Sequence, residues 1–168
     1  MADPQATLSI FAEVSVALAG FSGIVIAFGR RPTSSLSPLE IRRLSNLFIL
    51  SGLALLLSLL GISLLHLELK DAGLLWRSAS AIVVLLATPW LIWDVVRVFR
   101  LERSEMAEVN TYIVVIFDSL AVAMLLLQLA NWIVMAESWP FFLALVLMVA
   151  GAFQQFILLV QMGFRDRS

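Results

Sequence analysis

Residues 47–67 read LFILSGLALLLSLLGISLLHL, a run of 21 residues that contains no Asp, Glu, Lys or Arg. A helix of about 20 apolar residues is long enough to cross the ~30 Å hydrocarbon core of a bilayer. The run therefore predicts a transmembrane helix, and the rest of the chain has the same character on both sides of it.

The composition of the whole chain indicates that lipid is its solvent. Of the 168 residues, 61% are hydrophobic and 14% are charged, whereas soluble domains contain about 45–50% apolar and about 25% charged residues. A globular fold of this length has too little interior to bury so much apolar surface. Four further stretches are long enough to span a bilayer: Leu8–Phe28, Leu74–Val96, Tyr112–Met135 and Trp139–Met162.

These stretches predict an all-α integral membrane protein, a five-transmembrane-helix bundle in a single domain over residues 1–168. Ser37 and Glu40 have the spacing of a capping box, with Pro38 in the first turn. Gly29, shortly before Pro32, is typical of a helix end. With such start and stop signals, the predicted helices cover about residues 4–29, 38–67, 72–99, 105–135 and 139–163.

Lys and Arg are distributed unequally between the two sides of the predicted membrane. Nine of them lie in the connections after the first and third helices and in the C-terminal tail, and two lie on the other side. Because basic residues are retained in the cytoplasm, we expect the N-terminus outside and the C-terminus inside. The Ala12–Val25 stretch is similar to those of small bacterial inner-membrane proteins, so the expected location is the bacterial cytoplasmic membrane.

Acidic residues within the predicted spans are the first candidates for a function, because a charge at the bilayer centre costs about 2.5–3.5 kcal/mol even on lenient scales. Glu13 lies in the outer half of the first helix, and Asp118 lies in the inner half of the fourth. Carboxylates at both mouths with amides between them predict a path for monovalent cations or protons. The residues predicted for this path are Glu13, Ala17, Gly20, Ile24, Asp118, Gln128, Gln154 and Gln155.

The first predicted helix is also rich in small residues. Ala19, Gly23 and Ala27 are spaced four apart, which allows a second helix to approach closely. A five-helix protomer of this size encloses a pore only as a homo-oligomer, so we expect the first helix at the symmetry axis. Rings of carboxylates and apolar constrictions are known pore devices.

The same polar residues also fit a purely structural role. Intramembrane amides commonly form interhelical hydrogen bonds worth about 0.6–2 kcal/mol. The acidic residues have basic residues at similar depth or at helical spacing. The ion pairs expected on this interpretation are Glu13 with Arg77, Asp94 with Arg97, and Asp118 with Arg97 or Arg100.

The arginines around the first predicted cytoplasmic connection are expected to contact anionic lipid headgroups. They are Arg30, Arg31, Arg42 and Arg43. Membrane lipids are therefore the first expected partners, besides further copies of the chain.

Several functional classes are excluded. The chain has no cysteine and one histidine, His66, which lies at the end of the second span, so we expect neither a metal site nor a cofactor. Phosphate-binding loops, nucleophile elbows and zinc-protease motifs are absent, so we expect no enzyme activity. The arginines are interleaved with acidic residues, which argues against nucleic acid.

Three functions remain open at this point. The preferred one is a small oligomeric channel, or a channel-like subunit, for cations or protons. The alternative is a non-conducting membrane scaffold or accessory subunit. The third is a carrier for a small solute or lipid, which would use the region of Gln154 and Gln155.

Overall fold

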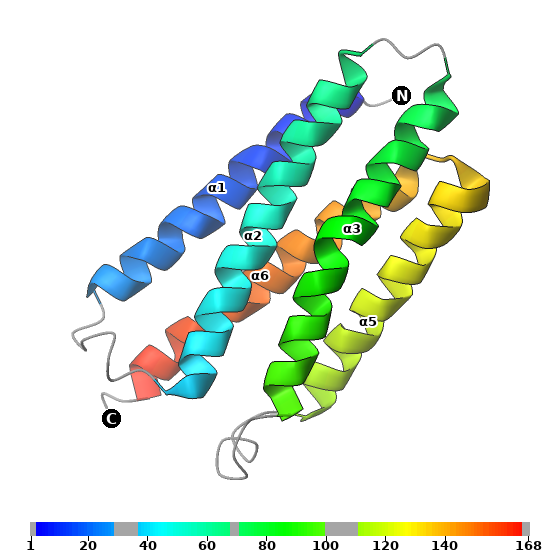
Figure 1. Cartoon of the computed structure of the whole chain (residues 1–168). Helices are drawn as coiled ribbons and strands as arrows, with labels where there is room; N and C mark the ends of the chain where they lie inside the picture. The colour runs from blue at the N-terminus through cyan, green and yellow to red at the C-terminus, as the bar shows by residue number, and fades with distance from the viewer. Residues whose placement is uncertain (1–2, 29–36, 68–70, 100–110, 166–168) are drawn as a thin grey trace.

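The computed structural model describes residues 3–28, 37–67, 71–99 and 111–165. They form α1 (Pro4–Phe28), α2 (Pro38–Leu65), α3 (Ala72–Phe99), α5 (Thr111–Ala130), the π-helical turn η2 (Asn131–Met135) and α6 (Trp139–Arg165) (Figure 1). Within these ranges five helices are long and apolar enough to cross a membrane, and there is no strand. The predicted all-α architecture with five potential spans is therefore confirmed. The predicted orientation of the termini stays a prediction. The predicted helices 4–29 and 105–135 include residues 29 and 105–110, which lie outside the described ranges.

The start of α2 shows how the sequence sets a helix boundary. The Ser37 side chain accepts a hydrogen bond from the backbone N–H of Glu40 at 3.2 Å, and the Glu40 carboxylate accepts one from the Ser37 N–H at 2.7 Å. Two of the backbone donors at the helix start are satisfied in this way. Pro38 occupies the first turn, where it sacrifices no helical hydrogen bond.

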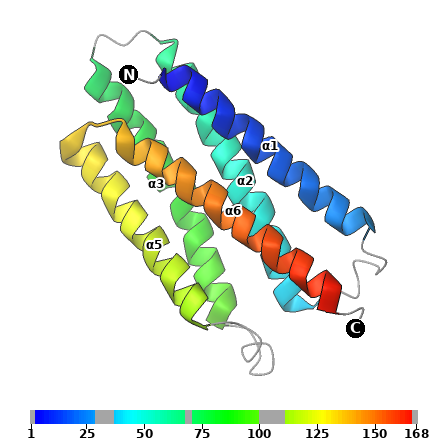
Figure 2. The same cartoon turned by 180° about the vertical axis from the view of Figure 1, so that it is seen from behind.

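The helix α2 occupies the centre of the bundle. It packs against α1, α3 and α6, and α3 packs in turn against α5. Figures 1 and 2 show α1 and α5 at opposite edges, with α6 crossing α2 and α3 on one side. We call the end where α2 and η2 finish the hairpin end, and the end where α2 begins, near Arg42, the arginine end. The helices α1 and α6 both run from the hairpin end to the arginine end.

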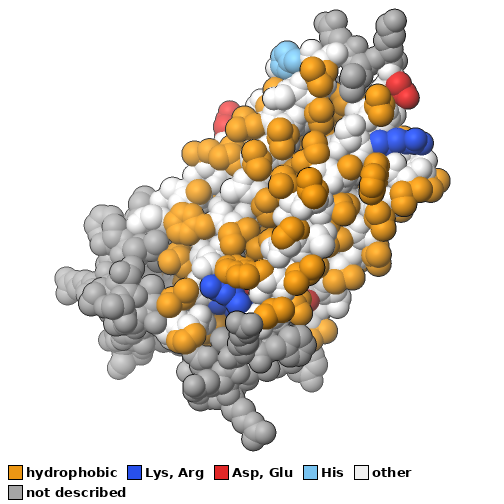
Figure 3. Space-filling model, viewed as in Figure 1, with side chains coloured by type: hydrophobic (Ala, Val, Ile, Leu, Met, Phe, Trp, Pro, Cys, Tyr) orange, Lys and Arg blue, Asp and Glu red, His pale blue; other side chains and the backbone are white. Residues whose placement is uncertain are grey.

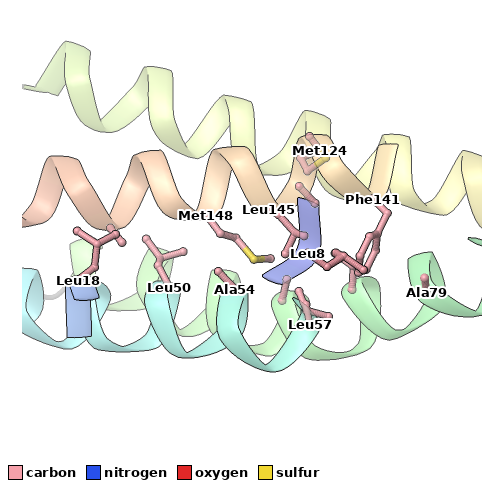
Figure 4. Packing of buried hydrophobic residues seen from close by; sticks show 14 of the residues in the cluster. Leu8, Leu18, Leu50, Ala54, Leu57, Ala79, Met124, Phe141, Leu145 and Met148 are labelled. Atoms are coloured by element: carbon pink, nitrogen blue, oxygen red, sulfur yellow. The ribbon is translucent and has the colours of Figure 1, made fainter. Parts of the chain in front are cut away.

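One hydrophobic core joins the helices. Figure 4 shows Leu145 and Met148 of α6 beside Leu50, Ala54 and Leu57 of α2. Ala54 and Leu145 are completely buried, so neighbouring helices meet without a gap at this level. This core holds the helices that carry the polar groups described below.

A glycine near the hairpin end lets three helices meet closely. A Cβ atom at Gly61 of α2 would lie 3.0 Å from Cδ1 of Leu8 and 3.2 Å from Cε1 of Phe141. Leu8 of α1 and Phe141 of α6 therefore lie at the level of Gly61. This contact fixes the height of α1 against the rest of the bundle.

The outer surface of the bundle is largely apolar. Leu85 of α3 and Val134 of η2 are each 71% exposed, and many other large hydrophobic side chains face outward. Figure 3 shows one face of this surface, with hydrophobic side chains over its middle and few charged ones. Such a surface is typical of helices that contact lipid tails and fits an integral membrane protein.

Candidate functional site

A charged cluster lies between α2 and α3 in the arginine-end half of the bundle. Nε of Arg42 donates to Oδ1 of Asp94 at 3.0 Å, and Nη2 donates to Oδ2 at 2.6 Å. Nδ2 of Asn46 donates to Oδ1 of Asp94 at 2.8 Å. All three residues are at most 7% exposed. A two-point arginine–carboxylate contact with an additional amide donor is among the stronger arrangements for a buried ion pair.

Asp118 of α5 lies at the level of this ion pair. The helices α3 and α5 run antiparallel, and Nδ2 of Asn131 donates to Oγ of Ser80 at 2.7 Å. Asp94 follows Ser80 by 14 residues on α3. Because α5 runs in the opposite direction, the residue level with Asp94 is 14 residues before Asn131, at position 117. The half-buried Asp118 carboxylate interacts electrostatically with Asp94 and Arg42. No described residue forms a hydrogen bond or an ion pair with it.

This cluster corrects two of the predicted contacts. Arg42 does not face lipid headgroups, because its side chain points into the bundle and pairs with Asp94. Asp94 does not pair with Arg97, whose guanidinium lies 3.7 Å from the ring centroid of Trp93. The physical reason is burial: inside the bundle Asp94 needs a partner that is also buried, and Arg42 on α2 provides one.

A second polar network lies at the hairpin end. Nδ2 of Asn131 donates to Ser80 and also to the carbonyl oxygen of Glu137 at 2.9 Å, and Oδ1 of Asn131 accepts from the Glu137 N–H at 2.9 Å. One side chain thus holds the connection between η2 and α6 and ties it to α3. The chain leaves η2 through Ala136, which has a φ of 59°.

Gln128, predicted to line an ion path, belongs to this same network. It is completely buried, and Nε2 donates to the carbonyl oxygen of Pro140 at 2.6 Å. It therefore joins α5 to α6 inside one protomer, as the structural interpretation expects. Gln154 and Gln155 of α6 are half-buried, and Oε1 of Gln154 is a buried atom without a hydrogen-bond partner.

The helix α1 has a very different polar group. Its buried residues Leu8, Ser15 and Leu18 face α2 and α6. At 100° per residue, Glu13, Ala17 and Gly20 lie along the opposite side, and all three are exposed. We call this side the Glu13 face, because its only carboxylate lies at the centre of the exposed arc.

Glu13 lies well away from the hairpin end, in the direction of the arginine end. Leu8 is level with Phe141, and Phe21 lies beside Phe156 with their ring centroids 6.1 Å apart. Because α1 and α6 run parallel, Glu13 is level with residues 146–148 of α6. By helical rise this is about 12 Å from the first residue of α6, whose 23-residue candidate span Trp139–Gln161 is about 34 Å long.

The two remaining predicted ion pairs, those of Glu13 and Asp118, are not found among the described residues. Glu13 and Arg77 are both exposed, and the described residues contain no ion pair between them. Their helices are not close packing partners: α1 packs mainly on α2 and α6, whereas Arg77 lies on α3. Asp118 has no ion pair with Arg97, and Arg100 lies outside the described residues.

The other predicted residues are placed as follows. Ala19 and Arg43 are half-buried, and Gly23 is exposed. Ile24 and Ala27 belong to α1, but their side chains lie outside the described part of the structure, as do Arg30 and Arg31 altogether.

Sequence reasoning missed two of the site residues. Asn46 follows Arg42 by four residues, so both lie on one face of α2. That spacing of two polar residues at the edge of an apolar run is the signal that identifies a buried pair. Ser80 carries no comparable signal, since serines in this chain also satisfy their hydroxyls locally, as Ser58 does with the carbonyl oxygen of Ala54 at 2.7 Å.

Comparison of the chain with family models, with curated proteins and with solved structures finds no match. The class that its fold supports is that of an all-helical integral membrane protein. Its acidic residues within the candidate spans lie mainly in two regions, the Glu13 face and the Arg42–Asp94 cluster.

Proposed function

We propose that the protein forms a homo-oligomer in the membrane and conducts monovalent cations or protons along a path lined by α1. The position of Glu13 carries this proposal. Its side chain is exposed at a depth where lipid tails would surround a single protomer. A carboxylate facing hydrocarbon costs about 2.5–3.5 kcal/mol even on lenient scales, and such groups almost always face a bundle interior or a water-filled cavity.

The neighbours of Glu13 on α1 support contact with a second copy of the chain. Gly20 and Gly23 are exposed, and a Cβ atom added at either would meet nothing within 4 Å. A lipid-facing surface gains nothing from such small residues, whereas a helix–helix interface gains close approach. Copies of α1 arranged around an axis would bring their Glu13 carboxylates into a ring, which attracts cations and repels anions.

A non-conducting scaffold is the second candidate, and the hairpin-end network favours it. Gln128 and Asn131 are completely buried and hydrogen-bonded within the protomer, so their role in holding helices together needs no transported ion. On this alternative, Glu13 contacts another copy without enclosing a path.

Flux through liposomes that contain the purified full-length chain separates the two candidates. We expect uptake of cations or protons above that of empty liposomes, and we expect Glu13→Gln to lower it by about tenfold or more, because the variant removes the charge that selects cations. The matched control is Glu137→Gln, which makes the same chemical change at an exposed carboxylate outside the candidate spans.

The outcomes are distinct. Flux that is lost in Glu13→Gln and kept in Glu137→Gln supports conduction along α1. Flux no greater than that of empty liposomes refutes conduction and favours the scaffold. Flux that Glu13→Gln leaves unchanged shows that any path runs elsewhere.

A further inference from the structure

Among the described residues, the charges of Arg42, Asp94 and Asp118 do not balance. Arg42 and Asp94 neutralise each other through a two-point contact. Asp118 adds a second carboxylate at the same level, and Asp94 and Arg42 are the described residues whose charges act on it. Arg97 stacks on Trp93, and Asp118 is the sole Asp, Glu, Lys, Arg or His in Thr111–Ala130. With both carboxylates ionised, Arg42, Asp94 and Asp118 together carry one excess negative charge within three candidate spans.

The amide of Asn46 adds an unused acceptor to this cluster. Its Nδ2 donates to the Asp94 carboxylate at 2.8 Å, so a flipped amide would bring its oxygen against a carboxylate oxygen. Oδ1 therefore points away from Asp94, and it has no hydrogen-bond partner although Asn46 is 2% exposed. Buried polar atoms without a partner are rare in folded proteins and call for an explanation such as a bound ion or water.

A second buried polar atom of the region, on Trp90, is also unpartnered. Trp90 precedes Asp94 by four residues on α3, so both side chains lie on one face of that helix. Nε1 of Trp90 is buried and has no acceptor. An indole N–H cannot bind a cation directly, but it can donate to the oxygen of a water molecule that hydrates one.

We propose that Asp118, Asn46 and the Arg42–Asp94 pair form a binding site for one monovalent cation, either a proton or a sodium ion. Carboxylate and amide oxygens are ligands of hard cations. A single positive charge matches the excess negative charge of the cluster, whereas a divalent cation would exceed it and be repelled by Arg42.

This site lies inside each protomer and is separate from the Glu13 face. Its residues belong to α2, α3 and α5, whereas α1 packs on α2 and α6. Cation binding here therefore requires neither an oligomer nor conduction along α1, so the proposal stands or falls independently of the proposed function.

The test uses the purified full-length chain in detergent and has two arms. Equilibrium binding of radioactive sodium at fixed pH measures occupancy by sodium. Infrared difference spectra recorded over a pH series measure the C=O stretch of a protonated carboxyl group. We expect one cation to bind per chain in one of the two arms. We expect Asp118→Asn to lower the affinity for this cation by about tenfold or more, since affinity follows the number of charged ligands.

Two further variants keep the test informative. Glu137→Gln changes an exposed carboxylate outside the cluster and outside the candidate spans, and it should leave binding unchanged. Asn46→Ala keeps both charged side chains of the Arg42–Asp94 pair and removes the amide oxygen, so it should weaken sodium binding. This variant provides the test if Asp118→Asn fails to fold. Melting curves without added cation identify a variant that is unfolded.

Each result decides the proposal. Saturable sodium binding that Asp118→Asn abolishes identifies sodium, and an infrared carboxyl band that Asp118→Asn removes without sodium binding identifies a proton. The proposal is overturned if the wild-type chain shows neither signal, or if Asp118→Asn and Asn46→Ala leave both signals unchanged.

Discussion

The Arg42–Asp94 cluster and the Glu13 face both carry a carboxylate within a candidate span, but their surroundings are opposite. Asp94 is 3% exposed, and three hydrogen bonds from Arg42 and Asn46 surround it. Glu13 points out of the bundle, and no described residue pairs with it. The fold of one chain provides a partner for the first carboxylate and leaves the second to whatever lies outside.

We therefore expect the cluster to act within the protomer and the Glu13 face to act between copies of the chain. Changes at the Arg42–Asp94 cluster should act on the stability of the protomer. Changes at the Glu13 face should leave the protomer intact and act on its assembly. The following four predictions compare changes inside the protomer with changes on the Glu13 face, from the largest expected effect on protomer stability to the smallest.

Arg42→Met should destabilise the protomer most, by about 3–5 kcal/mol, because it leaves the Asp94 carboxylate buried and unpaired. Denaturation in detergent measures the loss. The double variant Arg42→Met/Asp94→Leu should recover much of it, since no charge is then left unpaired. A double variant as unstable as Arg42→Met would contradict the interaction.

Asn131→Leu should cost about 1–3 kcal/mol, because it removes three hydrogen bonds and leaves the Ser80 hydroxyl and the Glu137 backbone with fewer partners. The same denaturation assay measures this cost. Trp132→Leu, at a neighbouring position that is 47% exposed, is the control and should have a smaller effect.

Gly61→Ala and Gly20→Ala form a matched pair of the same substitution. At Gly61 the new methyl group would crowd Leu8 and Phe141, so the free energy of unfolding should fall by about 1–3 kcal/mol. At Gly20 the methyl group meets nothing in the protomer, so stability should be unchanged or slightly higher, as expected from helix propensity. Equal losses at both positions would refute the placement of α1.

Gly20→Leu should have the smallest effect on the protomer, within about 0.5 kcal/mol, as is usual for exposed positions. It should nevertheless lower the fraction of oligomer, because a large side chain separates helices that approach through small residues. Light scattering in detergent measures the mass of the assembly. An unchanged mass would remove Gly20 from the interface.

The helices could be predicted from the sequence because the features that produce a helix lie close together along the chain. Apolar runs of bilayer length predict spans from composition alone, and the Ser37–Glu40 capping box forms between residues three apart. Neither inference requires knowledge of which helices are neighbours.

The partners of the charged residues could not be predicted in the same way, because they depend on how each helix is rotated about its axis. Arg42 lies near the end of a predicted span, so contact with lipid headgroups was the natural expectation. The spacing of Arg42 and Asn46 places both on one face of α2, but it does not say that this face meets α3, which depends on how α2 packs against three helices. Asp94 illustrates the same limit: Arg97 is close in sequence, and Arg42 is the partner in space.

Disulfide crosslinking tests the central claim, that the Glu13 faces of neighbouring copies meet, most directly. The chain has no cysteine, so a single Ala17→Cys substitution reports on contacts between copies of α1 without background. Leu126→Cys is the control, because Leu126 is 62% exposed on α5 at the opposite edge of the bundle (Figure 1). We predict that oxidation in lipid bilayers converts Ala17→Cys into covalent dimers and leaves Leu126→Cys monomeric. If Ala17→Cys stays monomeric, or if both variants crosslink equally, the Glu13 face is not the interface.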